Sequence, residues 1–446
     1  MKVNCKVLLL AVLAFFLCID ATAQSGAHNA YSPYSVYGVG DIFKEGSAYT
    51  RSMGGVGIAT RNRRVINFTN PAAVTARDSL SFMADFGVIE NNKVFNQTTD
   101  AGKFKSANNT FNISDFVLSF PIWRSSAFMV GITPFSDVGY DFTSHGTDPD
   151  IIGKTGNVTY QSYGQGGVYQ FFVGAGATFW KRLSVGAEFI YYFGTIDKVS
   201  NTVYTDESYR AINSGYTMQL RGTTGKFGLQ YEQKLGSDLS LTLGATYRLS
   251  TNMGGYANVY RFATASEVSD TLIFRTDTLR NSGKLRFGDE LGVGISLSSG
   301  ENWSVEFDYL RSDWRKSGFD SYQGTMVEGS SSTFRSTVSQ SFRAGFEYTP
   351  NRNDIRYYMK KVSYRGGLYF DRQYYCLDPS GRNVDAIGIT LGMTFPVFKG
   401  NNGITVGLDF GRKGNFKDRS MVGEHYATIF VGMNLHDIWF QKTMYK

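Results

Sequence analysis

Apolar and polar residues alternate with a period of two in many separate segments of the chain. The clearest segment is 238–250 (DLSLTLGATYRLS), where every second residue from Leu239 to Leu249 is apolar and the residues between are polar or small. Because successive side chains of a β-strand point to opposite faces, this pattern predicts strands with one apolar and one polar face. The same alternation recurs at 183–194, 291–298, 303–309 and 387–395.

The connections between the predicted strands alternate in length. Short turns are expected near 122–125, 181–182, 236–238, 299–302, 350–360 and 398–403. Long polar loops are expected near 91–110, 141–166, 197–214, 253–284, 315–337, 377–385 and 412–423. Short turns at one end and long loops at the other are typical of an outer-membrane β-barrel. Counting strands between them predicts about fourteen, with both chain termini on the short-turn side.

The tryptophans separate this prediction from a soluble β-sandwich or propeller, which would alternate in the same way with its apolar face inward. A soluble core would hold Trp mid-strand more often, whereas Trp in a membrane protein prefers the headgroup level. Trp314 falls at a long-loop end, and four others fall at the short-turn ends: Trp123, Trp180, Trp303 and Trp439. The expected fold class is therefore all-β, a transmembrane antiparallel β-barrel.

The first residues read as a secretory signal peptide, residues 1–23. Lys2 and Lys6 precede the apolar run 7–19, which is too short to span a bilayer, and an A-x-A cleavage site follows at 21–23. Removing this segment lowers the formal charge from +7 to about +6. The expected location is the outer membrane of a Gram-negative type cell.

Composition agrees with this class. After removal of residues 1–23, Cys376 is the one cysteine left, so no internal disulfide is expected in the exported chain. The 50 glycines and 15% aromatic residues suit a chain that alternates its apolar residues instead of clustering them.

Residues 24–78 come before the first convincing strand at 80–90. Their glycines with interspersed apolar residues suggest a compact unit that sits inside the barrel, residues 79–446, as a hatch or plug. Asn70, Pro71 and Ala72 resemble the NPA signature of the FadL-type outer-membrane transporters, which carry long-chain fatty acids and aromatic hydrocarbons. Further matches to a divergent branch of that family lie at 32–41, 53–55, 118–140, 342–351 and 364–396.

The resemblance implies a fourteen-stranded barrel, an N-terminal hatch, and a gap in the third strand through which an apolar substrate leaves sideways into the bilayer. Pro134 falls in the third predicted strand, where it cannot donate a ladder hydrogen bond. We therefore expect Thr133, Pro134, Phe135 and Gly139 to edge a lateral opening. The alternative is that Pro134 lies beyond the membrane.

Three arginines on predicted inward faces are candidates to pair with the carboxylate of a fatty acid: Arg248, Arg343 and Arg365. The alternative is that they pair with Glu188, Glu306 or Glu347 and hold the lumen together. The basic residues Arg61, Arg63 and Arg64 favour a contact between hatch and lumen over a nucleic-acid site.

The sequence shows no catalytic constellation, no metal site and no cofactor motif. The four histidines, His28, His145, His425 and His436, are dispersed, and Gly153-Lys154-Thr155 lacks the spacing of a phosphate loop. The predicted function is hatch-gated passive transport of hydrophobic small molecules, with outer-membrane lipid and an apolar ligand as partners. The alternatives are a FadL-like barrel that serves as a protein-export or surface-attachment partner through its external loops, an open porin, and an outer-membrane enzyme.

Overall fold

The computed structural model describes residues 31–78, 80–99, 102–123, 125–146, 148–206, 208–265, 268–279, 285–322, 334–377, 381–397, 402–414 and 421–438. The predicted signal peptide and Trp439 lie outside the described residues. Within the described ranges, no helix is long and apolar enough to cross a membrane.

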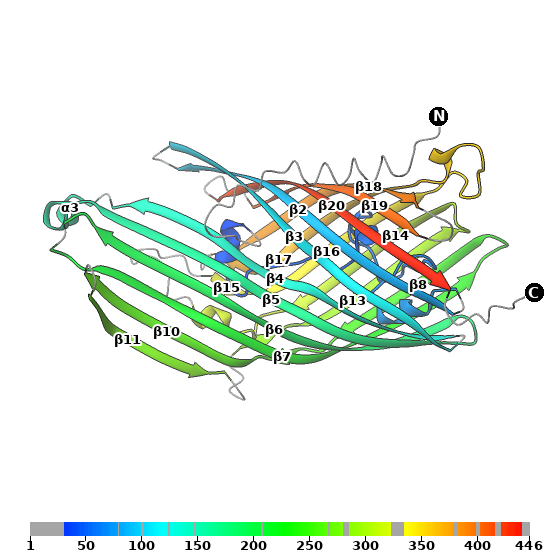
Figure 1. Cartoon of the computed structure of the whole chain (residues 1–446), viewed down its shortest axis with the longest axis horizontal. Coiled ribbons are helices and arrows are strands. Elements are labelled where there is room, and N and C mark those ends of the chain that lie inside the picture. The colour runs from blue at the N-terminus through cyan, green and yellow to red at the C-terminus, as the bar shows by residue number, and fades with distance from the viewer. Residues whose placement is uncertain are drawn as a thin grey trace, which may run out of the picture.

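Fourteen antiparallel strands form one closed ring (Figure 1). Each strand pairs with the next, and the last strand, β20, pairs with the first, β2, from Ser81↔Ile438 onward. This confirms the predicted fold class and strand number. The ring consists of β2 (Ser81–Thr99), β3 (Gly102–Trp123), β4 (Ser126–His145), β5 (Val158–Phe179), β6 (Leu183–Tyr204), β7 (Ala211–Lys234), β8 (Leu239–Arg248), β13 (Asp289–Ser299), β14 (Trp303–Asp313), β16 (Val338–Tyr348), β17 (Ser363–Leu377), β18 (Arg382–Pro396), β19 (Gly403–Lys413) and β20 (Gly423–Ile438).

Most of the shorter elements lie inside the ring or extend its long-strand end, and η4 lies in the turn between β16 and β17 at the other end. Figure 1 shows α3 and the β10–β11 hairpin at the left-hand end of the barrel, opposite the end where β20 finishes. These elements are η1 (Pro33–Val36), β1 (Asp41–Ile42), α2 (Ala48–Arg51), η2 (Pro71–Thr75), α3 (Pro149–Thr155), β9 (Thr251–Asn252), β10 (Gly254–Ala265), β11 (Val268–Thr278), β12 (Arg286–Phe287), η3 (Phe319–Tyr322), β15 (Phe334–Ser336) and η4 (Tyr358–Lys360).

The burial of the strands is the reverse of that in a soluble protein. On β8, Leu243 and Tyr247 are 48% and 41% exposed, whereas Thr242 and Thr246 are 4% and 5% exposed. The apolar face therefore points outward and the polar face points into the lumen. Such a surface is stable only against hydrocarbon, so the ring is an outer-membrane β-barrel. The same outward apolar face continues on β13 (Leu291, Val293, Ile295) and β18 (Ile387, Ile389, Leu391).

The short turns at 181–182, 236–238, 299–302 and 350–360 are confirmed, and those at 122–125 and 398–403 fall partly outside the described residues. Several segments expected to be long polar loops are strands. In the expected loop 91–110, β2 continues to Thr99 and β3 begins at Gly102. A spanning strand needs only about 9–11 residues, whereas β5, β6 and β7 have 22, 22 and 24 residues. Their outer halves therefore stand clear of the bilayer, where the outward face meets water instead of hydrocarbon. The polar residues in these outer halves therefore indicate exposure to solvent. They do not indicate that strand structure is absent.

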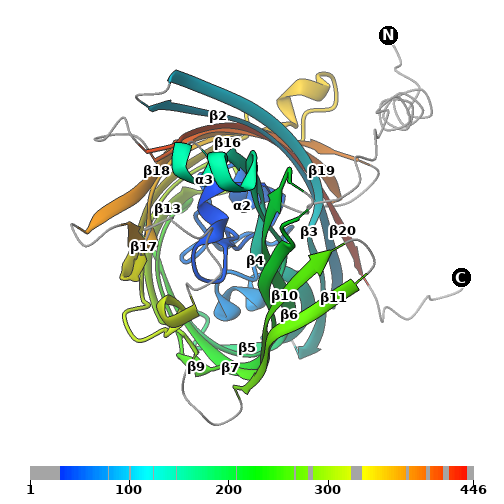
Figure 2. The same cartoon turned by 90° about the vertical axis from the view of Figure 1, so that its left-hand side faces the viewer.

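Residues 31–78, called the lumenal segment below, lie inside the ring (Figure 2). The segment starts at the long-strand end, where the Tyr34 hydroxyl donates to the Val422 carbonyl at 2.5 Å. It finishes at the short-turn end, where Arg64 pairs with Glu301. The ring itself begins at Ser81 and finishes at Ile438 at the short-turn end, whereas the two chain termini lie outside the described residues. The first described residues lie at the long-strand end, where Ser32 is bonded to the outer half of β4.

Glycines in the barrel wall let the lumenal segment pack directly against the strand backbones. A Cβ atom added at Gly367 of β17 would lie under 3.0 Å from the backbone of Met53 and Gly54. The lumenal segment and the wall therefore touch backbone to backbone. Added Cβ atoms would make similarly close contacts with the segment at Gly186, Gly228, Gly244, Gly345 and Gly392.

Substitution of Gly367 tests this packing. Gly367→Val should expel the middle of the lumenal segment, because overpacking costs about 1–3 kcal/mol and the clash is with backbone. Limited proteolysis should then cut residues 31–78 while the barrel keeps its heat-modifiable migration on gels. The neighbouring Gly366 faces outward, and an added Cβ would meet its nearest atoms at 3.8 Å, so Gly366→Val is the matched control. Equal protease resistance of both variants would contradict this account.

Candidate functional site

The barrel wall breaks between β3 and β4. Their pairing runs from Trp123↔Ser126 only as far as Phe116↔Ile132. Beyond that point β3 stays paired with β2 and β4 stays paired with β5. The two strands therefore separate directly before Thr133 and Pro134, in the third strand of the ring, where the sequence predicts a lateral opening.

The local chemistry of β4 explains where the break occurs. Pro134 has no N–H to donate to a neighbour, and the β4–β5 register shifts between Pro134 and Ser136, which leaves Phe135 as the extra residue of a bulge. Every residue from 133 to 140 is buried, so this stretch has no lipid-facing side and has turned into the barrel. Counting from 126 to 134, Pro134 is the ninth residue of β4, at about the length that a spanning strand requires. The break thus begins at the outer boundary of the membrane-spanning wall.

The lumenal segment covers the edge of β4 that β3 leaves. β1 pairs with β4 through Asp41↔Asp137 and Ile42↔Ser136. On either side of this pair, the Phe43 amide donates to the Phe135 carbonyl at 2.9 Å and the Ser32 amide donates to the Gly139 carbonyl at 2.8 Å. The backbone groups that a closed wall would satisfy through β3 are therefore satisfied by residues 32–43. This pairing could not be predicted from the sequence, because residues 32–43 show no strand alternation.

An aromatic cluster lies behind the break, in the outer half of the lumen. Phe135 is 4% exposed, and its ring centroid lies 4.8 Å from that of Tyr192 and 4.9 Å from that of Phe287. Trp314 joins the cluster, with its ring centroid 4.6 Å from that of Tyr374. The prediction that Trp314 lies at the headgroup level is therefore wrong. The chain turns inward after β14, and the Trp314 side chain is 1% exposed.

A cavity of about 250 Å³ adjoins the cluster and is amphipathic. Pro134, Phe135 and Trp314 form part of one side, and charged side chains form much of the rest. The charged residues include Lys44, Glu45, Arg248, Glu290, Arg343 and Asp371.

Two of the three predicted lumenal arginines line this cavity. Arg248 donates to Glu290 at 3.1 Å, and Arg343 donates to the Gly55 carbonyl at 2.8 Å. Arg365 lies elsewhere and donates to Glu347 at 2.6 Å, which is the pairing given as the alternative. The structure therefore brings Arg248 and Arg343 toward the break and leaves Arg365 as an ion-pair partner in the wall.

Charged wall residues hold the outer part of the lumenal segment. Lys226 of β7 donates to both carboxylate oxygens of Glu45, at 2.7 and 2.8 Å. Lys198 of β6 donates to the Val36 and Gly38 carbonyls at 2.8 and 2.9 Å. These charged contacts fix the outer part of the segment, in addition to the buried side chains of Tyr34 and Val39.

Lys44 and Arg51 are two buried cations of the lumenal segment itself. The Lys44 Nζ lies 3.5 Å from Asp371 and 3.6 Å from Asp409. Burial lowers the pKa of the Lys44 ammonium, and the carboxylates of Asp409 and Asp371 partly offset that shift. Burial also lowers the pKa of the Arg51 guanidinium to about 10, which leaves it charged at neutral pH.

The predicted hatch motif anchors the inner part of the lumenal segment. The Asn70 Oδ1 accepts from the Ala72 amide at 3.0 Å and caps η2. The Asn70 Nδ2 donates to the Ile58 carbonyl at 2.7 Å and to the Leu229 carbonyl of β7 at 3.3 Å. Asn70 is fully buried, so one side chain joins the helix cap, a neighbouring turn and the barrel wall. Pro71 sets the first residue of η2 and lies against the wall glycines Gly186 and Gly228.

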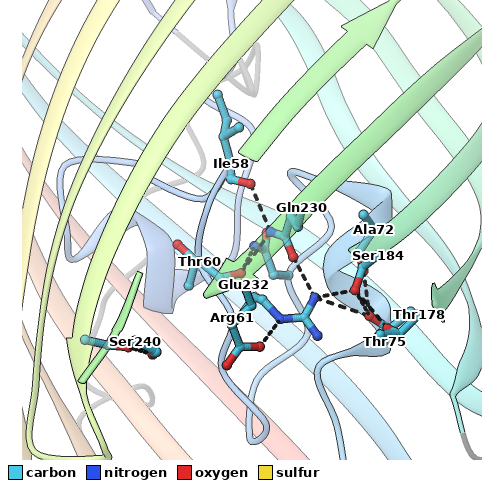
Figure 3. A network of polar contacts seen from close by, with 12 residues as sticks. Ile58, Thr60, Arg61, Ala72, Thr75, Thr178, Ser184, Gln230, Glu232 and Ser240 are labelled. Carbon is cyan, nitrogen blue, oxygen red and sulfur yellow. Dashed lines mark hydrogen bonds and ion pairs between the residues drawn. The ribbon is translucent and has the colours of Figure 1, made fainter. Parts of the chain in front are cut away.

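Arg61 is the centre of a polar network beside this motif (Figure 3). Its Nε pairs with Glu232 at 3.2 Å, and its Nη1 donates to Ser184 at 2.8 Å and to Gln230 at 3.0 Å. With the Arg64–Glu301 pair, this confirms the expected contact between the arginine cluster and the barrel. The inner half of the lumenal segment is therefore held to the wall by side-chain hydrogen bonds from Asn70 and Arg61.

These features define a class: a fourteen-stranded outer-membrane β-barrel whose lumen holds its own N-terminal segment and whose wall is split at the third strand. The chain belongs to the BamG family, which matches residues 5–446. No curated protein matches it in sequence.

Solved structures share the fold at low sequence identity. The toluene transporter TbuX of Ralstonia pickettii is 15% identical, with a TM-score of 0.54 over 88% of this chain and 98% of that chain. The toluene transporter TodX of P. putida is 14% identical, with a TM-score of 0.55 over 90% and 100% of the two chains. A Pseudomonas aeruginosa FadL homologue is 10% identical, with a TM-score of 0.53 over 90% and 99%. The predicted FadL-type architecture is therefore confirmed as a fold.

Replacing Asn70 tests the anchor. Asn70→Ala removes the cap and one of the two side-chain donors to the Ile58 carbonyl, which also accepts from Gln230 at 2.9 Å. Together these losses cost about 1–3 kcal/mol. Hydrogen exchange of backbone amides between 57 and 75 should therefore speed up by about 5- to 150-fold if they exchange through local opening. Asn353→Ala, in an exposed turn between β16 and β17, is the matched control. Unchanged protection in Asn70→Ala would show that the motif does not hold the segment.

Proposed function

We propose that this barrel carries hydrophobic small molecules, such as long-chain fatty acids or aromatic hydrocarbons, across the outer membrane by passive diffusion. The observation that carries the proposal is the break in the wall at Pro134, which begins at the outer boundary of the spanning wall and is backed by the aromatic cluster. The toluene transporters TbuX and TodX, which share the fold, support this substrate class.

The route that we propose runs from the aromatic cluster to the break and sideways into the bilayer. An apolar chain gains roughly 0.8 kcal/mol for each methylene it buries, so it partitions poorly into a water-filled pore. The rings of Phe135, Tyr192 and Trp314 offer an apolar surface next to the break. For a fatty acid, Arg248 and Arg343 line the adjoining cavity and supply the charge that a carboxylate requires.

Release of residues 32–43 from β4 is the gating step in this proposal. These residues cover the lumenal edge of the break through a short run of backbone hydrogen bonds. The inner part of the lumenal segment stays in place during this step, held by Asn70 and Arg61. The segment thus acts as a hatch in its outer part and as an anchor in its inner part.

A reversible tether tests the gate. Ile42 and Ser136 are directly opposite in the β1–β4 pair, and antiparallel partners have the Cα spacing that a disulfide accepts. The double variant Ile42→Cys, Ser136→Cys should therefore fix residues 32–43 to β4. Uptake of radiolabelled long-chain fatty acid or toluene into vesicles containing the purified barrel should be lost on oxidation and restored by reductant.

The matched control places the same tether in a closed part of the wall. Leu297 and Val305 are directly opposite in the β13–β14 pair, so Leu297→Cys, Val305→Cys should leave uptake unchanged in both redox states. Equal uptake by the oxidised and reduced Ile42–Ser136 variant would overturn the gate. No apolar uptake by the unmodified barrel, measured against a sugar, would overturn the transport function itself.

A second candidate function is partnership with an exported or surface protein. The tall sheet formed by the outer halves of β5, β6 and β7 favours it, because strands of 22–24 residues extend well beyond the bilayer. Such a surface offers far more area to another protein than a transporter of small molecules requires.

A further inference from the structure

The break in the wall has a second side, the outer edge of β3. Residues 103–111 of this strand pair with β2, from Thr98↔Lys103 to Glu90↔Phe111. Within the described part of the chain, no strand pairs with their opposite side, because β4 has turned inward and its own edge is bonded to β1. Residues 103–111, called the β3 edge below, therefore carry a row of backbone donors and acceptors that faces away from the barrel.

The β3 edge is exposed on both of its faces. Residues 103–107 are exposed in succession, which does not occur in a strand covered on one side. Phe104 is 56% exposed and Phe111 is 54% exposed, although both are large aromatic side chains. Counting back from Trp123, these residues lie beyond the 9–11 that span the bilayer. Their apolar surface is therefore presented at the cell surface.

The charges of the β3 edge are all of one sign. Lys103 and Lys105 alternate on the same face as Phe111, and residues 103–111 (KFKSANNTF) contain no acidic residue. Lysines on an edge strand disfavour unselective pairing with other strands. They also select for a partner strand that places acidic residues opposite them, since opposite charges on cross-strand neighbours stabilise a pair.

We propose that the β3 edge is a docking site for an extended strand of another surface or outer-membrane protein, which joins the sheet by β-augmentation. The partner strand supplies acidic residues against Lys103 and Lys105 and an apolar residue against Phe111. Main-chain hydrogen bonds provide the affinity, and the alternating side chains provide the selectivity. The site is separate from the proposed transport route, because it uses the side of the break that the lumenal segment does not contact through β1.

Photocrosslinking in intact cells tests the site. A photoreactive amino acid at Ala107 of the full-length protein lies in the middle of the β3 edge and is exposed. It should give one discrete adduct, and mass spectrometry should map the crosslink to an acidic, extended segment of the partner. The matched control is Thr195, an exposed residue of β6 that is paired on both sides, with Gly167 and Gln219; it should give no such adduct.

Charge reversal then tests the chemistry. Lys103→Glu with Lys105→Glu should abolish the Ala107 adduct, whereas Lys154→Glu, an exposed lysine of α3, should leave it intact. Heat-modifiable migration reports that each barrel is folded, and the uptake assay should be unaffected by either change. A folded barrel without the adduct would overturn the proposal. So would an adduct with a second copy, an adduct with residues 24–30 of the same chain, or an adduct that survives charge reversal.

Discussion

Backbone polar groups have no water to bond within a bilayer, so a strand that leaves the wall must find another partner there. The closed ring meets this requirement strand by strand within the bilayer, where the pairing of β20 with β2 closes the wall. The departure of β4 at Pro134 is tolerated because residues 32–43 accept and donate the hydrogen bonds that β3 gives up. The need for a hydrogen-bond partner for every backbone polar group therefore accounts for the closed wall, for the segment inside it and for the position of the break.

The parts of the fold that the sequence predicts are those that the membrane dictates. Hydrocarbon on one side and a wet lumen on the other impose period two, and this is why Leu243 and Thr242 could be assigned to opposite faces. The same constraint makes Pro134 conspicuous in the third strand. Beyond the bilayer the constraint ends, since the outward face of a strand meets water instead of hydrocarbon. Residues 91–110 consequently carry no alternation, although most of them belong to β2 and β3.

The contents of the lumen were harder to predict because they depend on partners far apart in the sequence. Periodicity places Arg248 and Arg365 on inward faces but does not distinguish Glu290 from Glu188 as a partner. The pairing of Lys226 with Glu45 joins a strand to a segment without any periodic pattern. Trp314 shows the same limit, since its position near a strand end suits a headgroup as well as a buried cluster. The segment Asn70-Pro71-Ala72 stands out in the sequence because local capping and a wall contact need only three adjacent residues.

The closure of the ring also sets an order of assembly. The lumenal segment precedes the first strand in the chain, yet it ends up enclosed by a wall whose final seam joins β2 to β20. Contacts between the wall glycines and residues 53–72 leave no clearance for threading the segment through a finished ring. The segment therefore has to be in position before the ring closes. If β2 paired with β20 before the lumenal segment was inside, the ring would close around an empty lumen and the segment would remain outside.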